Sequence, residues 1–271
     1  MSEDIPDLKE LIILIRGAGE MATGVAYRLF QSGFRVCLTE IAKPLAVRRE
    51  VSFSEAVRLG GITIEGVTAK RVENIQGILD GWHGGWVPVL IDPEASIRKT
   101  LNPDVLVDAI LAKKNLGTRI QDASLVIGLG PGFQAGKDDH YVVETNRGHH
   151  LGRIIPEGEA EPDTGIPGMI AGYTEERVLR APGAGIFSGK KKIGGSVKKG
   201  ERIAEVSGFA INARISGVLR GVLPDGIEVL AGMKVGDIDP RGIREHCFTI
   251  SDKARGIGGG VLEAILRHFN R

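Results

Sequence analysis

The stretch from Leu11 to Glu40 constrains the fold of this chain more than any other part of the sequence. It begins with the apolar run "LIILI" (11–15), continues through the turn "RGAGEMATG" (16–24) and ends in "FRVCLTE" (34–40). The apolar run has the length and composition of a buried parallel strand. Apolar residues recur at helical spacing between residues 21 and 31, and Gly33 follows them. A strand, a helix and a second strand within about 30 residues form one βαβ unit, which predicts a parallel sheet.

The rest of the chain extends this pattern and then departs from it. Further buried strands are expected in 87–93 and 124–132, with a helix at 102–115 that Asn102 would cap and Pro103 would begin. After about Leu179, short alternating strands separated by glycine form two similar halves. We therefore expect an α/β protein with a Rossmann-like doubly wound parallel sheet in 1–178 and a second, smaller all-β domain in 179–245. A helix in 246–271 is expected to return to the first domain.

The composition restricts the class of protein. Lys and Arg together number 35 and Asp and Glu 34, and this net charge of +1 argues against a general nucleic-acid binder. No apolar run is long enough to cross a bilayer, and the acidic start "MSEDIPDLKE" does not resemble a signal peptide. Only two cysteines are present, which argues against a disulfide scaffold. We expect a cytoplasmic protein that binds neither nucleic acid nor membrane.

The turn after the first strand matches the pattern G-x-G-x-x-A. In such a turn the first glycine makes the bend, the second lets a pyrophosphate approach the backbone, and the third small residue permits close packing. The helix amino terminus then supplies N–H groups for the phosphate, and an acid at the end of the next strand accepts from a ribose hydroxyl. The expected nucleotide-binding residues are Gly17, Ala18, Gly19, Glu20, Met21, Ala22 and Glu40. The alternative is a glycine turn that binds no dinucleotide.

Two charged residues flank this turn and leave the ligand undefined. Glu20 favours the helix dipole but opposes a nearby phosphate, so it would either pair with Arg16, the favoured hypothesis, or hold a metal that accompanies the phosphate. Arg48 and Arg49 would either meet a phosphate near Glu40 or lie on a solvated surface.

The segment after the strand at 124–132 supplies further candidates. Gly130, Pro131 and Gly132 are expected to shape a backbone-lined pocket beyond the end of this strand, and Arg147 or Arg153 to face an anionic ligand. If the protein is an enzyme, the candidate catalytic residues are His140, His149 and His150. Because these side chains follow no metal-ligand spacing, we predict no metal site.

Three other features have two interpretations each. Asp92 follows a strand and would either contact a ligand or cap the next segment. The glycines at 256 and 258–260 would either bind phosphate at a helix start or allow close packing. Cys37 is expected in the core, and the place of Cys247 stays open, although either thiol could in principle carry persulfide or selenide.

Two resemblances give these features a context. Residues 179–240 resemble a biotinyl/lipoyl-like barrel-sandwich fold, but the hairpin between its halves reads "VSGFA" (206–210) and lacks the lysine to which a carrier group is attached. The whole chain resembles the YqeB family, accessory proteins of selenium-dependent molybdenum hydroxylases. The segments that carry this resemblance are "IRGAGEMATGVAYRL", "RREVSFSEAV", "GPGFQAGKDDHYVVETNRGHHLGRI", "DTGIPGMIAGYTEERVLRAP", "DIDPR" and "TISDKARGIGGGVLEAIL".

The second resemblance implies a maturation factor that binds a nucleotide or a nucleotide-bearing molybdenum cofactor. The ligand would be a dinucleotide, either NAD(P) or molybdopterin cytosine dinucleotide, or a free nucleotide. The implied partners are a molybdenum hydroxylase or its maturation proteins. Whether the protein forms homo-oligomers is left open. The alternatives are an NAD(P)-dependent oxidoreductase acting on a molybdopterin or selenium intermediate, and a non-catalytic scaffold.

Overall fold

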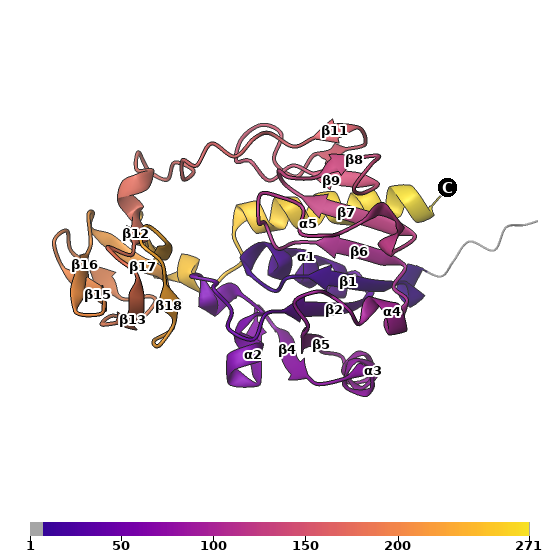
Figure 1. Cartoon of the computed structure of the whole chain (residues 1–271), viewed down its shortest axis with the longest axis horizontal. Coiled ribbons are helices and arrows are strands. Elements are labelled where there is room, and N and C mark those ends of the chain that lie inside the picture. The colour runs from indigo at the N-terminus through magenta and orange to yellow at the C-terminus, as the bar shows by residue number, and fades with distance from the viewer. Residues whose placement is uncertain (1–7, 271) are drawn as a thin grey trace, which may run out of the picture. The chain divides into compact units, whose positions relative to one another are not determined.

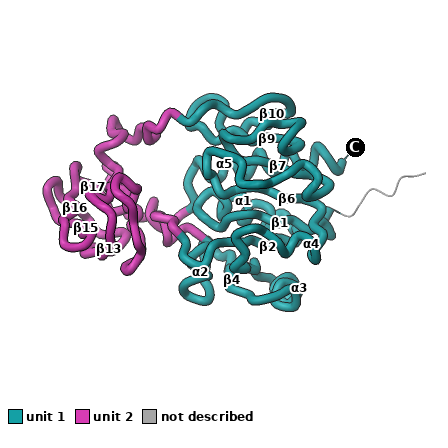
Figure 2. Tube along the Cα trace, in the orientation of Figure 1, with its two compact units in different colours: residues 1–44, 53–163, 250–271 teal, residues 45–52, 164–249 magenta. Residues whose placement is uncertain are grey.

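The computed structural model describes residues 8–270 (Figure 1). The chain divides into two compact units (Figure 2). Unit 1 comprises the chain up to Pro44, Phe53–Asp163 and the part from Ile250 onward, and unit 2 comprises Leu45–Ser52 and Thr164–Thr249. The boundaries expected from the sequence are 178/179 and 245/246, with residues 45–52 in the first domain. Most of the acidic segment at the start of the sequence, which we do not expect to be a signal peptide, lies outside the described residues.

Unit 1 contains a mixed nine-stranded sheet with the order β10-β9-β7-β6-β1-β2-β5-β4-β3. All neighbouring strands from β4 to β9 run parallel, and only the edge strands β3 and β10 are antiparallel to their neighbours. The strands are β1 (Ile12–Arg16), β2 (Arg35–Glu40), β3 (Gly61–Ile64), β4 (Val67–Val72), β5 (Val87–Ile91), β6 (Val105–Asp108), β7 (Leu125–Leu129), β9 (Tyr141–Val143) and β10 (Ile154–Ile155). A large, mostly parallel sheet in an α/β protein is thereby confirmed. The Rossmann-like assignment stays a prediction.

Helices cover both faces of this sheet (Figure 1). One face packs against α1 (Glu20–Gln31) and α5 (Asp252–Phe269), and the other against α3 (Ile75–His83) and α4 (Arg98–Leu101). The short helix α2 (Glu55–Leu59) precedes β3, and single 3₁₀ turns occupy η1 (Leu8–Glu10) and η3 (Ile120–Asp122). A small pair of strands, β8 (Gln134–Ala135) and β11 (Gly158–Glu159), lies outside the large sheet.

Two glycines allow α1 and α5 to approach each other closely. A Cβ on Gly24 would lie 2.6 Å from the carbonyl oxygen of Ala254, and a Cβ on Gly258 would lie 2.8 Å from the carbonyl oxygen of Gly24. The glycines at 256 and 258–260 therefore lie inside α5, which begins at Asp252, and not at its start. Of the two interpretations of these glycines, this geometry fits close packing.

The prediction of a helix at 102–115 is wrong. The four residues of β6 are all buried and pair with β1 and β7, because the apolar run "VLV" suits a central parallel strand. Asn102 is in the left-handed conformation (φ 48°) and ends α4 instead of capping a new helix. Residues 109–119 have no regular secondary structure. The strands expected at 11–15, 34–40 and 87–93 and the helix at 21–31 are confirmed within one or two residues, and the strand expected at 124–132 is confirmed but ends three residues earlier, at Leu129.

Unit 2 consists of two four-stranded sheets, β12-β19-β17-β14 and β16-β15-β13-β18. All strand pairs within these sheets are antiparallel. The two sheets enclose one apolar core that includes Phe187, Leu219 and Ile238. The strands are β12 (Val178–Arg180), β13 (Gly185–Gly189), β14 (Ser196–Val197), β15 (Arg202–Val206), β16 (Phe209–Asn212), β17 (Gly217–Val222), β18 (Glu228–Val229) and β19 (Lys234–Asp239). The 3₁₀ turns η2 (Arg49–Val51), η4 (Glu175–Arg177) and η5 (Arg244–Cys247) complete the unit. The expectation of short strands is confirmed, and the barrel-sandwich assignment stays a prediction.

Candidate functional site

The strand order of the large sheet reverses at β1. The chain moves from β1 to β2 on one side and later returns to β6 on the other, so the loops after β1 and β6 lie next to each other at the carboxyl edge, the edge at which open α/β sheets bind ligands. Gly17 (φ +99°) opens the loop after β1, and a Cβ there would lie 3.1 Å from the carbonyl oxygen of Ala109. Gly17 is therefore required both for its backbone conformation and for the contact between these two loops.

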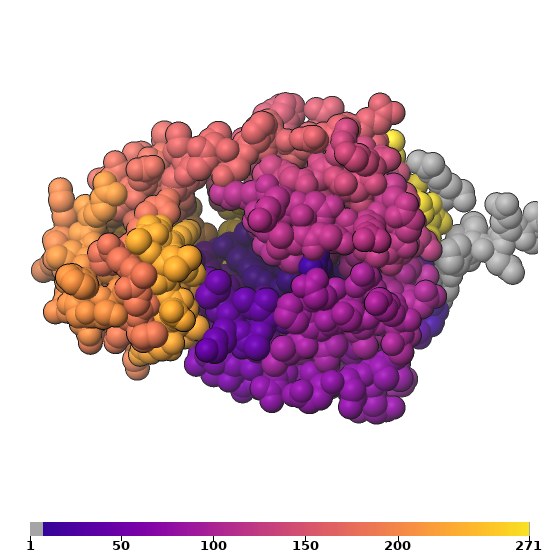
Figure 3. Space-filling model, viewed as in Figure 1, coloured from indigo at the N-terminus to yellow at the C-terminus, as the bar shows by residue number. Residues whose placement is uncertain are grey.

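The amino terminus of α1 follows the loop after β1 and has open backbone N–H groups. Gly19 is the N-cap residue, has extended backbone angles and makes no side-chain cap, and a Cβ there would meet nothing within 4 Å. Within residues 8–270, no hydrogen bond satisfies the backbone N–H of Gly19 or Met21. Unsatisfied N–H groups at the positive end of a helix bind anions. In the space-filling view, indigo atoms are visible at the floor of a groove between purple and magenta segments (Figure 3).

Glu40 is engaged within the protein. Its Oε2 accepts a hydrogen bond from the N–H of Ala18 at 3.0 Å, and its Oε1 accepts from the N–H of Ile41 at 2.8 Å. Burial raises the pKa of the Glu40 carboxyl, and these two N–H donors oppose that shift. The carboxylate therefore orders the glycine loop, and each of its oxygens keeps a second acceptor position.

Glu20 and Arg16 do not pair with each other, so that hypothesis is wrong. Glu20 accepts a hydrogen bond from the hydroxyl of Ser251 at 2.7 Å, which joins the amino termini of α1 and α5. Arg16 is only 5% exposed and forms an ion pair with Asp108 at 3.3 Å. The two side chains diverge because Arg16 still belongs to β1, whereas Glu20 is the first residue of α1.

Arg16 joins three loops at the carboxyl edge of the sheet. Its guanidinium donates to Asp108 at the end of β6, to the hydroxyl of Thr118 at 3.1 Å and, at 3.4 Å, to the carbonyl oxygen of Pro93 after β5. Thr118 in turn donates to Asp108 at 2.6 Å. Sequence reasoning missed this cluster because it assigned Asp108 to a helix. The run "VLVD" was the available signal, since it places an acid at the carboxyl end of a strand.

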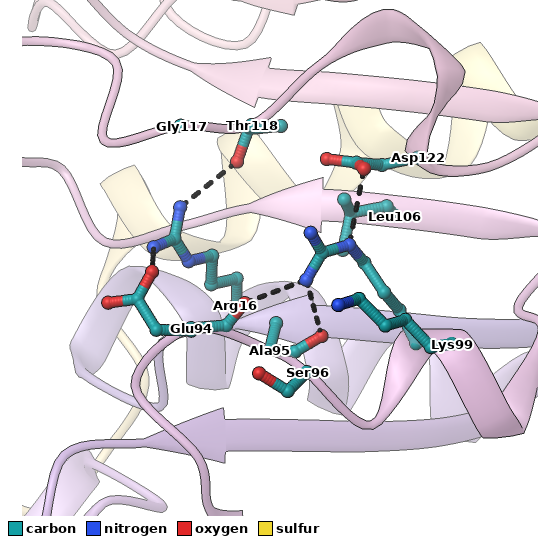
Figure 4. A pocket seen from close by; sticks show the side chains of 10 residues that line it. Arg16, Glu94, Ala95, Ser96, Lys99, Leu106, Gly117, Thr118 and Asp122 are labelled. Carbon is teal, nitrogen blue, oxygen red and sulfur yellow. Dashed lines mark hydrogen bonds and ion pairs between the residues drawn. The ribbon is translucent and has the colours of Figure 1, made fainter.

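A polar pocket of about 190 Å³ lies beside Arg16 (Figure 4). Leu106 of β6, the turn after β5 and the segment before β7 contribute to its walls. Arg98 crosses it, donating to Asp122 at 3.2 Å and to the carbonyl oxygen of Ala95 at 2.9 Å. The pocket is lined by Arg16, Glu94, Ala95, Ser96, Arg98, Lys99, Leu106, Gly117, Thr118 and Asp122.

The histidine candidates are not brought to the glycine loop. His140 precedes β9 at the amino-terminal edge of the sheet, where its Nδ1 accepts from the N–H of Val126 at 3.0 Å. Burial lowers the pKa of His140, and the nearby His268 adds to this effect. His149 and His150 are exposed on the loop after β9, with ring centroids 5.0 Å apart. That strand is separated from β1 by β7 and β6.

The remaining candidates of this region have structural contacts. Arg147 pairs with Asp252 at 2.5 Å instead of facing an open pocket. A Cβ on Gly130 would lie 2.3 Å from the hydroxyl of Thr145, and a Cβ on Gly132 would lie 2.5 Å from the backbone of Lys114. Pro131 lies between these glycines and is partly exposed, and Arg153 is exposed. The 130–132 turn is therefore packed against its neighbours.

Asp139 is the most unusual polar group of unit 1. It is fully buried, and neither carboxyl oxygen has a hydrogen-bond partner of normal geometry among residues 8–270. It lies against β7, where a Cβ on Gly128 would be 2.2 Å from its Oδ2. Burial, with a contribution from the charge of Asp138, raises the pKa of Asp139 to about 7.

The features with two interpretations are placed as follows. Asp92 accepts from the N–H of Ile97 at 2.8 Å and so caps a turn. Arg48 donates to the carbonyl oxygens of His246 and Thr249, and Arg49 donates to that of Val222, all within unit 2.

Cys37 and Cys247 are buried, and burial raises the pKa of both thiols. In the described part of the chain no three His, Cys, Asp or Glu side chains gather as metal ligands, and no helix is long and apolar enough to cross a membrane.

Comparisons with known proteins give one relative of substantial identity. The chain is 49% identical over 255 residues to a protein of Escherichia coli (strain K12) described as uncharacterized protein YqeB. The match covers 94% of this chain and 47% of the relative, so the chain spans about half the length of that protein. No protein-family model matches the chain.

Solved structures give only weak similarity. The product-bound ectoine utilization protein EutE (DoeB) from Ruegeria pomeroyi is 11% identical, with a TM-score of 0.25 over 84% of this chain and 85% of that chain. Succinylglutamatedesuccinylase/aspartoacylase from Rhodobacter sphaeroides is 13% identical, with a TM-score of 0.27 over 84% and 85% of the two chains. TM-scores this low carry no argument about this protein.

Proposed function

We propose that this chain is an accessory protein for the maturation of selenium-dependent molybdenum hydroxylases. The proposal starts from membership of the YqeB family, which the 49% identity supports. In this proposal unit 1 is a Rossmann-like domain that holds a nucleotide-bearing ligand, and unit 2 is a barrel-sandwich module without a carrier lysine that contacts the hydroxylase or another maturation protein. The ligand is molybdopterin cytosine dinucleotide or a free nucleotide.

The observation that carries the binding proposal is the open amino terminus of α1 at the point where the strand order reverses. The unsatisfied N–H groups of Gly19 and Met21 face the space into which a diphosphate would fit. Gly19 leaves room for that approach, whereas Gly17 and Glu40 hold the loop in shape.

The same geometry favours a binding role over the oxidoreductase alternative. A hydride transfer needs a proton donor within hydrogen-bond reach of the reacting group. His140 lies at the amino-terminal edge of the sheet, opposite to the edge that carries the glycine loop. His149 and His150 follow a strand three positions away from β1, which corresponds to roughly 14 Å.

Thermal melting with candidate ligands tests the binding site. A ligand present at about 100 times its dissociation constant should stabilise the protein by about 2.7 kcal/mol. We expect stabilisation by cytidine nucleotides or by molybdopterin cytosine dinucleotide. Gly19→Asp, which places a side chain and a negative charge where the phosphate would lie, should abolish it. Gly183→Asp is the matched control, since a Cβ on Gly183 also meets nothing within 4 Å.

The outcomes separate the alternatives. Stabilisation by NAD or NADP alone would support the oxidoreductase, and no stabilisation by any nucleotide would leave a scaffold. The maturation role itself is tested in cells that make a selenium-dependent molybdenum hydroxylase. Without this protein the hydroxylase should accumulate lacking active cofactor, and wild-type protein should restore it where Gly19→Asp does not. Full hydroxylase activity without the protein would refute the role.

A further inference from the structure

A second recess opens on unit 1, on the sheet face opposite α1 and α5. It has a volume of about 570 Å³ and adjoins the pocket beside Arg16, with which it shares Arg98, Lys99, Gly117 and Asp122. Its walls are α4 with the residue after it, and the segment that leads into β7. It is lined by Arg98, Lys99, Asn102, Gly117, Arg119, Gln121 and Asp122.

Positive charge exceeds negative charge in this recess. Three cationic side chains line it and only one carboxylate, that of Asp122, which leaves a surplus of two positive charges. Asp122 is already paired with Arg98 at 3.2 Å. Neither Lys99 nor Arg119 forms an ion pair within residues 8–270. A small dianion would balance the two unpaired cations.

Unusual backbone conformations cluster on the segments that frame the recess. Seven described residues other than glycine have a positive φ, and four of them, Ala95, Asn102, Leu111 and Lys113, lie between residues 95 and 113. Ala95 lines the adjoining pocket and Asn102 lines the recess. Such conformations cost about 1–3 kcal/mol each for most residues and gather at functional sites. Ala95 and Asn102 lie between β5 and β6, and Leu111 and Lys113 lie in the segment without regular structure between β6 and β7.

The lining also restricts the chemistry of the ligand. It includes no aromatic side chain on which a base could stack, and the amides of Asn102 and Gln121 add hydrogen-bonding groups. Pockets for small molecules usually measure about 300–1,000 Å³ and are mostly apolar, so this polar recess of ordinary size suits a hydrophilic ligand. A phosphate monoester carries about −1.5 to −2 charges at neutral pH.

We infer that this recess is a binding site for a small hydrophilic phosphate monoester, of the sugar phosphate or polyol phosphate class. Lys99 and Arg119 bind the phosphate from opposite walls, and the amides of Asn102 and Gln121 bind the hydroxyl groups. The site is separate from the amino terminus of α1 and does not depend on the nucleotide site proposed above.

Calorimetric titration of the full chain with glycerol 3-phosphate tests this inference, with glycerol and inorganic phosphate as comparison ligands. We expect glycerol 3-phosphate to bind, inorganic phosphate to bind more weakly and glycerol not to bind. The double variant Lys99→Gln/Arg119→Gln should weaken binding by at least about tenfold, because two charge-assisted contacts are lost. The variant Gly19→Asp should bind as the wild type does, since the two sites are separate.

The double variant Lys199→Gln/Arg214→Gln is the matched control, because it removes the same charge from exposed positions outside the recess. It should bind like the wild type. The inference is overturned if glycerol 3-phosphate fails to bind at about 10 mM, a ligand level at which even millimolar affinities are detected. Equal binding by the Lys99/Arg119 variant, or equal weakening in the control, would also overturn it. Melting curves of both variants establish that they are folded.

Discussion

Replacing Asp139 by Asn should make the protein more stable at about pH 8 and change its stability far less at about pH 5. The carboxyl of Asp139 is fully buried and has no hydrogen-bond partner of normal geometry among residues 8–270, and its pKa is raised to about 7 from an ordinary value of 3.8. The folded protein therefore keeps this proton up to about pH 7, whereas the unfolded chain releases it near pH 4. Folded stability falls as the pH rises through this window, because the folded state binds more protons there.

The size of the effect follows from the two pKa values. Each pKa unit corresponds to about 1.4 kcal/mol, so the ionised carboxylate destabilises the fold by up to about 4 kcal/mol above pH 7. An amide has nearly the shape of a protonated carboxyl and cannot ionise. Burying its N–H groups costs about 1–3 kcal/mol, but this cost is the same at both pH values. The expected result is a difference of about 2–4 kcal/mol between the effects of Asp139→Asn at the two pH values.

Urea unfolding followed by tryptophan fluorescence is the assay. Both tryptophans, Trp82 and Trp86, belong to unit 1, so the signal reports the unit that contains Asp139. Glu157→Gln, which removes an exposed carboxylate from the same unit, is the control and should show no such pH dependence. If wild type and Asp139→Asn give parallel stability profiles between about pH 4 and pH 8, the carboxyl titrates normally in the fold and the reasoning is refuted.

Four further substitutions test the packing of unit 1 by the same unfolding assay. Gly17→Ala should destabilise by about 1–3 kcal/mol, because φ +99° is strained for alanine, whereas Gly19→Ala, at φ −68°, should change stability by less than about 0.5 kcal/mol. Equal effects would contradict the loop geometry. Arg16→Met should cost about 3–5 kcal/mol by leaving its buried carboxylate partner uncompensated, and a loss below about 1 kcal/mol would show that the pair is solvated. Gly258→Val should separate α1 from α5 and cost about 1–3 kcal/mol; wild-type stability would mean that the helices pack elsewhere.

The sequence determined the local elements whose signals lie close together in the chain. The apolar run before Gly17, the helical spacing after it and the second strand up to Glu40 fixed the first βαβ unit, because each feature depends on neighbours within one or two turns. The glycine-rich alternation after Leu179 likewise indicated short strands. The sequence also singled out the amino terminus of α1 as the place for a phosphate, since that property belongs to a single helix end.

Only the tertiary structure decided which side chains are free. Glu40 accepts a hydrogen bond from the amide of Ala18. Arg147 forms an ion pair with Asp252, and Arg16 forms one with Asp108, a residue 92 positions away. The run "VLVD" became a central strand and not a helix because β1 and β7 lie on both sides of it. Asp139 became a buried acid, and Lys99 and Arg119 came to line one recess. Burial and pairing depend on segments far apart in the chain, and a sequence pattern reports only on segments that are close.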